Sequence, residues 1–352
     1  MKEPLLQQQD LTKSQNKGSK LWIFQALLTG LMFGFANFTV AIISDSGFKA
    51  LSNIGIIPYF FFIGYRLFQC YQNKRKYGTY INYRKSNFFD EFRNFKWINL
   101  VPLLGNGLSN FTNLMTITFA FQYAGMAGMN QGVVTTLNTL TSVYNVIIFY
   151  FGFNERVTVI QLVGMLTMMT CVGFISVSSQ QASTDSSLTD QDLQQRQYYG
   201  YISILFALLS PLSLSVKHIF IRKFKKQYDS WDVSIDGLIF EYQIYLLIAI
   251  YYFSQSQVVW EDLLIGTIGS LFIAVGKISI ALAVANGIAG PAASLSTTQV
   301  IYLTLLTTLV QGQTLKAFEI IGLICGIIGA IIISSGDLIY SKFFKQSSNK
   351  QQ

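Results

Sequence analysis

The sequence predicts an all-α integral membrane protein whose ten transmembrane helices form a 5+5 inverted-topology repeat. Apolar residues make up 51% of the chain and charged residues only 12%, a composition that the surface of a soluble domain could not carry. Ten apolar stretches each have about the twenty residues that a helix needs to cross a bilayer. Because five is odd, a second set of five helices enters the membrane in the opposite orientation, as in many secondary transporters.

Polar segments divide the chain into two halves of five spans each. The first half covers 21–178 and the second 198–340, with a linker at 179–197 and polar tails at 1–20 and 341–352. In order, the predicted spans are 21–44, 49–71, 97–121, 126–151, 157–178, 198–220, 236–254, 262–286, 288–310 and 317–340.

The distribution of Lys and Arg predicts that both termini are cytoplasmic. Nineteen of these residues fall in the alternate connections that include both tails, and only Lys49, Arg196 and Lys316 fall in the others. The acidic, Ser- and Gln-rich segment 179–197 then lies on the opposite side, where we expect a disordered linker. Residues 1–20 lack the apolar core of a signal peptide, so the first span is expected to serve as an uncleaved insertion signal. The sequence does not distinguish the plasma membrane from an internal one.

A faint internal similarity favours a duplication. A shift of 158 residues aligns 132–176 with the second half at seven identical positions, which include Thr139 with Thr297 and Tyr144 with Tyr302. Apolar helices share a small alphabet, so the matching order of apolar and polar segments adds as much support as the identities do.

Polar side chains follow one helix face in three predicted spans, because they recur at spacings of three and four residues. Span 97–121 has Asn106, Asn110 and Asn113. Span 126–151 has Gln131, Thr135, Asn138, Ser142 and Asn145, and span 288–310 has Ser294, Thr297, Thr304 and Thr308 with Thr298 and Gln299 alongside.

These faces have two interpretations. Their side chains can form hydrogen bonds between helices, or they can line a polar cavity that binds a substrate. Neutral carboxamides suit a hydroxyl-rich or zwitterionic solute. The candidate substrate-binding residues are Asn110, Asn113, Gln131, Thr135, Asn138, Thr297 and Gln299.

Lys277 is a further substrate-binding candidate. It lies about nine residues from the cytoplasmic end of its span, too deep for its ammonium to reach water easily. Glu241 enters its own span from the same side, so the two side chains could meet. Lys277 is then either a counter-charge for a phosphate or carboxylate, with Glu241 as its partner when no substrate is bound, or half of a structural ion pair. Arg66, Lys217 and His218 are predicted to be interfacial anchors.

Three short motifs resemble the EamA-like branch of the drug/metabolite transporter superfamily. They are Met32–Phe38 (MFGFANF), Phe119–Gly128 (FAFQYAGMAG), and Phe153–Arg156 (FNER) followed by Gln161 and Gly164. The resemblance covers about residues 21–340. It implies ten helices in a 5+5 arrangement with cytoplasmic ends. Gln313 and Asn154 depart from the family's usual Glu and Gly at positions that have a structural part in that family.

Several function classes are unsupported by the sequence. A single histidine, His218, excludes multi-histidine metal sites, and no phosphate-binding loop or catalytic carboxylate pair is present. We therefore expect a non-enzyme without metal or cofactor, whose partners are a small-molecule substrate and the lipid bilayer, with no nucleic acid. A homodimer is left open.

The expected function is secondary transport of a small polar metabolite by alternating access between the two halves. The alternatives are a nucleotide-sugar or phosphorylated-metabolite exchanger of an internal membrane and, outside transport, a polytopic receptor or scaffold. Substrate, coupling ion and direction stay open.

Overall fold

The structure, a computed structural model, consists of helices, and its described residues contain no strand. It describes residues 21–80, 86–90, 92–127, 135, 137–138, 140–155, 157–180, 190–257, 259–311, 317–318, 320–322 and 324–333. The labelled helices are α2 (Leu21–Ile43), η1 (Ser44–Asn53), α3 (Ile57–Tyr77), η3 (Trp97–Asn99), α4 (Leu100–Met126), α6 (Leu140–Phe153), α7 (Val159–Gln180), α8 (Asp190–Phe224), α9 (Ser230–Ser254), α10 (Trp260–Asn286), α11 (Ala289–Ser296) and α12 (Gln299–Gln311).

Several of these helices are long and apolar enough to cross a bilayer. Within the described residues, the helical stretches that meet this criterion are Leu21–Tyr77, Gln194–Phe224, Ser230–Ser254, Trp260–Asn286 and Ala289–Val310. Large apolar side chains such as Phe24, Leu247 and Leu309 are exposed on the outside of the molecule. Such side chains are stable against lipid, and helices satisfy their backbone groups internally. The chain is therefore an all-α integral membrane protein.

The second predicted span begins later than its apolar run. The run starts near residue 49, but η1 occupies this region, and Gly47 within it has φ +59°, a conformation that favours glycine. α3 then starts at Ile57, with Pro58 in its first turn, where proline needs no hydrogen-bond partner. It ends at Tyr77 because Gly78 adopts the left-handed conformation and caps the helix.

The predicted disordered linker at 179–197 is wrong over its second part. α7 extends to Gln180, and α8 already begins at Asp190, so residues 190–197 are helical. This segment is rich in Gln, Leu and Arg, which favour helices, and Asp190 and Asp192 lie in the first turn, where the helix dipole stabilises negative charge. Residues 181–189 lie outside the described part.

The predicted span 288–310 is divided into α11 and α12. Thr297 and Thr298 form a turn between them, and each hydroxyl donates to a carbonyl three residues earlier, at 2.6 Å for Thr297 and 2.9 Å for Thr298. Such local bonds compete with the helical pattern. In the predicted span 126–151, α6 starts only at Leu140, after a turn at Asn138.

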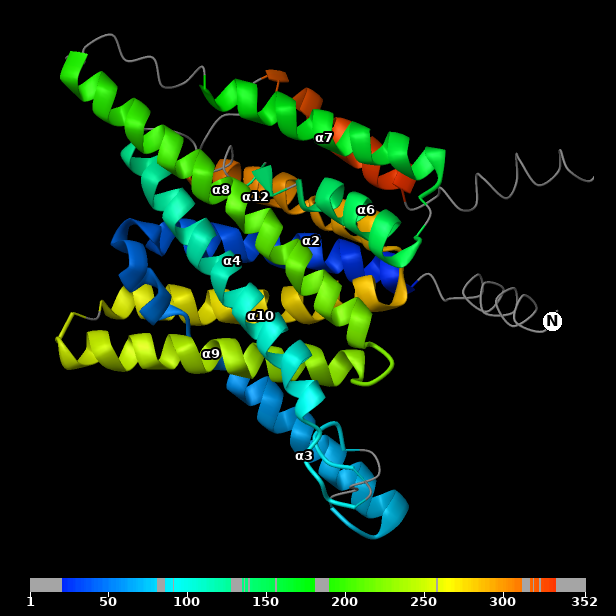
Figure 1. Cartoon of the computed structure of the whole chain (residues 1–352). Helices are drawn as coiled ribbons and strands as arrows, with labels where there is room; N and C mark the ends of the chain where they lie inside the picture. The colour runs from blue at the N-terminus through cyan, green and yellow to red at the C-terminus, as the bar shows by residue number, and fades with distance from the viewer. Residues whose placement is uncertain are drawn as a thin grey trace, which may run out of the picture.

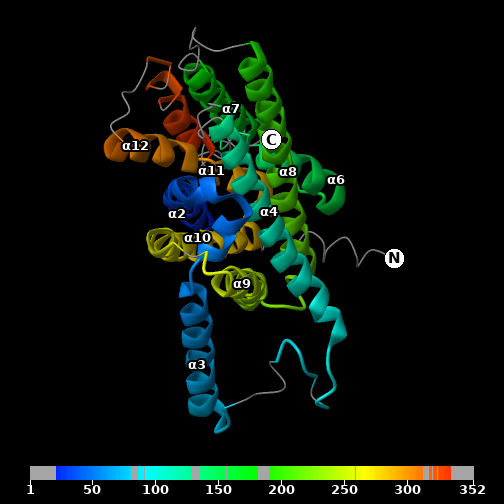
Figure 2. The ribbon, with the colours of Figure 1, turned by 90° about the vertical axis from the view of Figure 1, so that its left-hand side faces the viewer.

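The helices are arranged around α2. This helix packs on α10, α12 and α11, while α4 packs along α8 and then α9. Figure 1 shows α9 and α10 side by side, with α4 and α8 crossing them at an angle. In Figures 1 and 2, α3 extends from one side of the molecule, where it contacts α9 and α10, and α7 lies on the opposite side.

Small residues allow the closest approach between helices. A Cβ added at Gly30 would lie 2.0 Å from the Thr298 hydroxyl, and one at Gly34 would lie 2.5 Å from Tyr302 Cβ. In a membrane, where lipid is as apolar as the helix surface, such tight packing is a main source of helix association. Gly30 and Gly34 thus set the distance between α2 and α12.

We expect Gly34→Val to destabilise the protein by about 1–3 kcal/mol, because the added side chain would overlap with Tyr302. The measurement is the thermal unfolding midpoint in detergent. Gly152→Val is the matched control, since a Cβ at Gly152 meets no atom within 4 Å. Equal midpoints for the two variants would contradict the packing of α2 on α12.

Candidate functional site: a buried ion pair and its surroundings

An ion pair lies in the interior of the helical bundle. Lys277 Nζ on α10 contacts Glu241 Oε1 on α9, and the side chains are 3% and 0% exposed. Tyr245 donates its hydroxyl proton to the same carboxylate oxygen at 2.6 Å. Taking both charges out of solvent is costly, so each depends on the other. The sequence predicted this approach, and the structure brings the two residues together.

Lys217 is buried beside this pair, so its prediction as an interfacial anchor is wrong. Its side chain on α8 is 1% exposed and lies close enough to Lys277 and Glu241 for their charges to act on it. Among the described residues, its Nζ has no hydrogen-bond partner. The sequence does hold a signal, because Lys217 precedes the end of α8 by about two turns. Only the neighbouring helices decide that it points inward.

His218 is also buried, so it is not an anchor either. Its Nδ1 lies 2.8 Å from Nδ2 of Asn145 on α6, and its Nε2 has no partner among the described residues. Neighbouring positions on a helix point about 100° apart. Lys217 therefore faces α9 and α10 while His218 faces α6.

Aromatic hydroxyls complete the surroundings of the pair. Tyr242 packs edge-on against Tyr245, with ring centroids 5.2 Å apart, and both are fully buried. The hydroxyls of Tyr242 and of Tyr59 on α3, together with Glu241 Oε2, have no partner within the described part of the chain. The sequence analysis named none of these tyrosines, since buried aromatic residues are usually part of a core.

The asparagines of α4 bind other helices. Asn106 donates to Val233 O on α9 at 2.8 Å, and Asn110 donates to Asn106 Oδ1 at 3.4 Å. Asn113 donates to Ser210 Oγ on α8 at 2.7 Å, and this hydroxyl donates to Asn138 Oδ1 at 2.8 Å. Asn113 and Asn138 are thus brought together, and these contacts fit the interpretation of the polar faces as interhelical hydrogen bonding.

The remaining predicted residues are placed separately. Asn37 on α2 donates to Gln299 Oε1 at 3.2 Å. Thr297 forms its local bond in the turn between α11 and α12. Thr135 is buried, and Gln131 lies outside the described residues. The seven predicted polar residues therefore do not form one cluster with Lys277.

Arg66 is held by carboxylates rather than anchored at the interface. It pairs with Asp232 at 3.3 Å and with Asp236, both on α9. Tyr228, in the turn before α9, donates to the second Asp236 oxygen. Burial, reinforced by the charge of Asp236, raises the pKa of the Tyr228 phenol. This cluster joins α3 to the start of α9.

A second cluster joins the loop after α6 to helices of the second half. Glu155 pairs with Arg222 on α8 and accepts a hydrogen bond from Ala289 N at 3.1 Å, at the start of α11. Arg222 also donates to Val284 O and Ala285 O, the last carbonyls of α10. The ends of two helices are thereby satisfied by opposite charges. Glu155 belongs to the Asn154–Arg156 motif and has a structural role here.

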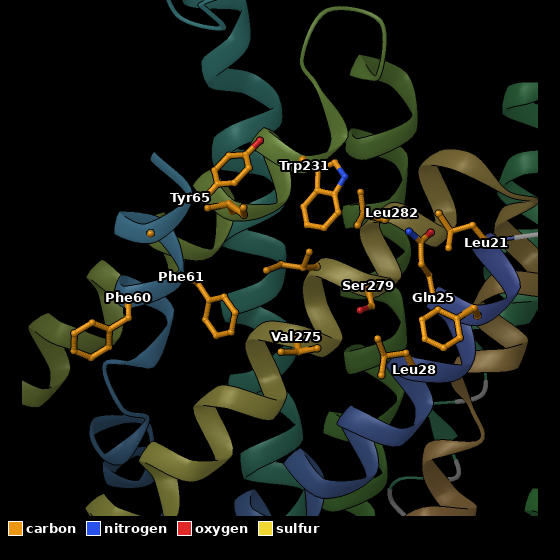
Figure 3. A pocket seen from close by; sticks show the side chains of 14 residues that line it. Leu21, Gln25, Leu28, Phe60, Phe61, Tyr65, Trp231, Val275, Ser279 and Leu282 are labelled. Atoms are coloured by element: carbon orange, nitrogen blue, oxygen red, sulfur yellow. The ribbon is translucent and has the colours of Figure 1, made fainter. Parts of the chain in front are cut away.

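A pocket of about 780 Å³ opens between α2, α3, α9 and α10 (Figure 3). Phe60, Phe61, Tyr65 and Trp231 point into it, and Gln25 and Ser279 are among its few polar residues. None of the predicted substrate-binding residues lines it. An apolar lining supplies few partners for a polar solute and suits hydrocarbon.

No family model matches the sequence, and no curated protein matches it. Among solved structures, 27 chains match. One of them, described only as "Crystal structure of protein", superposes with a TM-score of 0.56 at 16% sequence identity. The match covers 88% of this chain and 98% of that chain. At this identity, the similarity shows a shared fold.

We expect Glu241→Gln to destabilise the protein by about 3–5 kcal/mol, because Lys277 would be left as a buried charge without a carboxylate. The paired variant Glu241→Gln/Lys277→Met removes both charges and should regain most of the loss. Thermal midpoints in detergent measure both effects. The ion pair is refuted if Glu241→Gln unfolds at the wild-type temperature.

We expect Glu155→Gln and Arg222→Gln to be non-additive, since each removes the same ion pair. A double-mutant cycle on thermal stability should give a coupling of about 0.5–3 kcal/mol. Lys223→Gln, which changes an exposed neighbour on α8, provides the control cycle with Glu155→Gln. Additive losses for Glu155 and Arg222 would contradict the contact.

Proposed function

We propose that the protein is a secondary transporter that moves a small polar organic metabolite by alternating access. The observation that carries this proposal is the Lys277–Glu241 pair, which lies in the interior of an apolar helical membrane protein beside unpartnered polar atoms. Ionisable groups are costly at membrane depth, and where they occur they commonly belong to substrate or ion pathways.

The proposal includes ten spans in two inverted halves, as in the EamA-like proteins that the motifs resemble. Two helix interruptions support it. The turn at Asn138 precedes α6, and the turn at Thr297 precedes α12, while the repeat shift of 158 residues pairs Thr139 with Thr297. Interrupted helices at corresponding positions of two halves are typical of transporters with inverted repeats.

Alternating access requires contacts between the halves that can break at one end. The two charged clusters are suitable, because Arg66 and Glu155 belong to the first half while Asp232, Asp236 and Arg222 belong to the second. Both clusters involve residues on either side of the connection between α8 and α9. We propose that they hold this end closed in the conformation described here.

A thiol-labelling experiment tests the inverted topology. Thr79 follows α3 and Ser256 follows α9, so they occupy corresponding connections of the two proposed halves, and both are exposed. In a background without Cys70, Cys171 and Cys325, Thr79→Cys and Ser256→Cys should react with an impermeant reagent from opposite sides of the membrane. Labelling from the same side would overturn the inverted repeat.

Transport itself is tested by counterflow in proteoliposomes. The panel contains nucleotide sugars, sugar phosphates, amino acids, polyamines and organic cations, without ATP. We expect saturable exchange of at least one class, and its loss in the Glu241→Gln/Lys277→Met variant, whose buried charges cancel and whose fold should persist. Lys223→Met is the control. Absence of exchange for every class would favour a receptor or scaffold.

A further inference from the structure

The buried charges near α8, α9 and α10 do not cancel. Lys217, Lys277 and Glu241 are 1%, 3% and 0% exposed, and Lys217 is close enough to the other two for their charges to act on it. With all three ionised, the group carries one excess positive charge inside the bundle. Uncompensated charge in a medium of low dielectric constant is costly, so this arrangement favours an anion as a fourth member.

The group also has unused hydrogen-bonding capacity. Lys217 Nζ and the hydroxyls of Tyr242 and Tyr59 are buried donors without a partner among the described residues. Tyr242 senses the charge of Glu241 and lies near Tyr59. Buried polar groups in folded proteins nearly always have partners, so a set of donors left over around one point indicates a missing acceptor. Oxygen atoms of an anion are such acceptors.

The position of the group suits a transported ligand. Lys277 lies nine residues before the end of α10, which corresponds to roughly 14 Å along the helix. Glu241 lies eleven residues after the start of α9, roughly 16 Å. Both values are near the middle of a 30 Å hydrocarbon layer. Lys217, Glu241 and Lys277 come from the second half, and Tyr59 on α3 comes from the first, so a ligand here would contact both halves.

We propose that Lys217 and Lys277 bind a small oxyanion, a carboxylate or a phosphate ester, with the Tyr59 and Tyr242 hydroxyls as additional donors. The anion shares Lys277 with Glu241, which keeps that lysine paired when the site is empty. This inference rests on the proposed function and narrows its substrate to anionic metabolites. It assigns Lys217 a direct role in binding.

The first experiment measures binding to the full-length protein in detergent. The probes are inorganic phosphate and acetate, compared with chloride at the same ionic strength and with neutral glycerol. Phosphate or acetate should raise the thermal midpoint by roughly 2–5 °C at saturation, because each binds the folded state. Chloride and glycerol should not. A larger effect of phosphate than of acetate identifies the phosphate ester, and the reverse identifies the carboxylate.

Variants then locate the site. Lys217→Met should fold, since it replaces a buried, unpartnered cation by an apolar side chain of similar length, and it should weaken anion binding at least 10-fold. Lys217→Arg keeps the charge and should retain part of the binding. Lys223→Met, which removes an exposed cation six residues further along α8, should bind as the wild type does. If Lys217→Met does not fold, the comparison of Lys217→Gln with Lys217→Arg answers the same question.

The proposal is overturned if neither anion shifts the wild-type midpoint, or if both shift Lys217→Met as much as the wild type. These outcomes are separate from failure of the transporter assignment. Exchange of neutral or cationic solutes without anion binding would refute the oxyanion site alone. Anion binding at Lys217 without exchange in proteoliposomes would refute transport and leave the site in place.

Discussion

A charge removed from water must find a partner, and this constraint governs the interior of the protein. Lys277 and Glu241 lie at membrane depth, where their attraction offsets the loss of hydration only if α9 and α10 stay in register. Tyr245 donates to the same carboxylate and supports that register. The positions of the surrounding helices therefore depend on one contact between two side chains.

The same reasoning applies to the neutral polar groups. The asparagines of α4 reach a carbonyl of α9 and a hydroxyl of α8, and Asn37 reaches Gln299 across α2 and α12. Without water, these amides find partners on other helices and fix their rotation. Glycines at the close contacts remove side chains that would keep the helices apart. Polar contacts and small residues thus define together which faces meet.

The charged clusters at one end differ from the central pair in exposure. Arg66, Glu155 and Arg222 remain partly accessible, so water can replace their partners when the contacts break. A buried pair has no such replacement. The proposed mechanism uses this difference, because separable contacts lie at one end of the molecule while the costly charges remain inside.

The sequence by itself determined the all-α membrane class, the position of most helices and the approach of Lys277 to Glu241. These features follow from hydropathy and from the distance of a residue to its helix end, both of which are local properties. Glycine and proline marked where α3 begins and ends, although the apolar run obscured its start.

Only the tertiary structure decided which polar residues face inward and what they contact. Lys217 and His218 lie near a helix end, where charged residues usually reach the interface, yet neighbouring helices cover both. Arg66 found carboxylates on α9, and the polar residues of 97–121, 126–151 and 288–310 were distributed over several separate contacts. The rotation and tilt of a helix are set by the surfaces packed against it. That information is spread over the whole chain, and no single segment contains it.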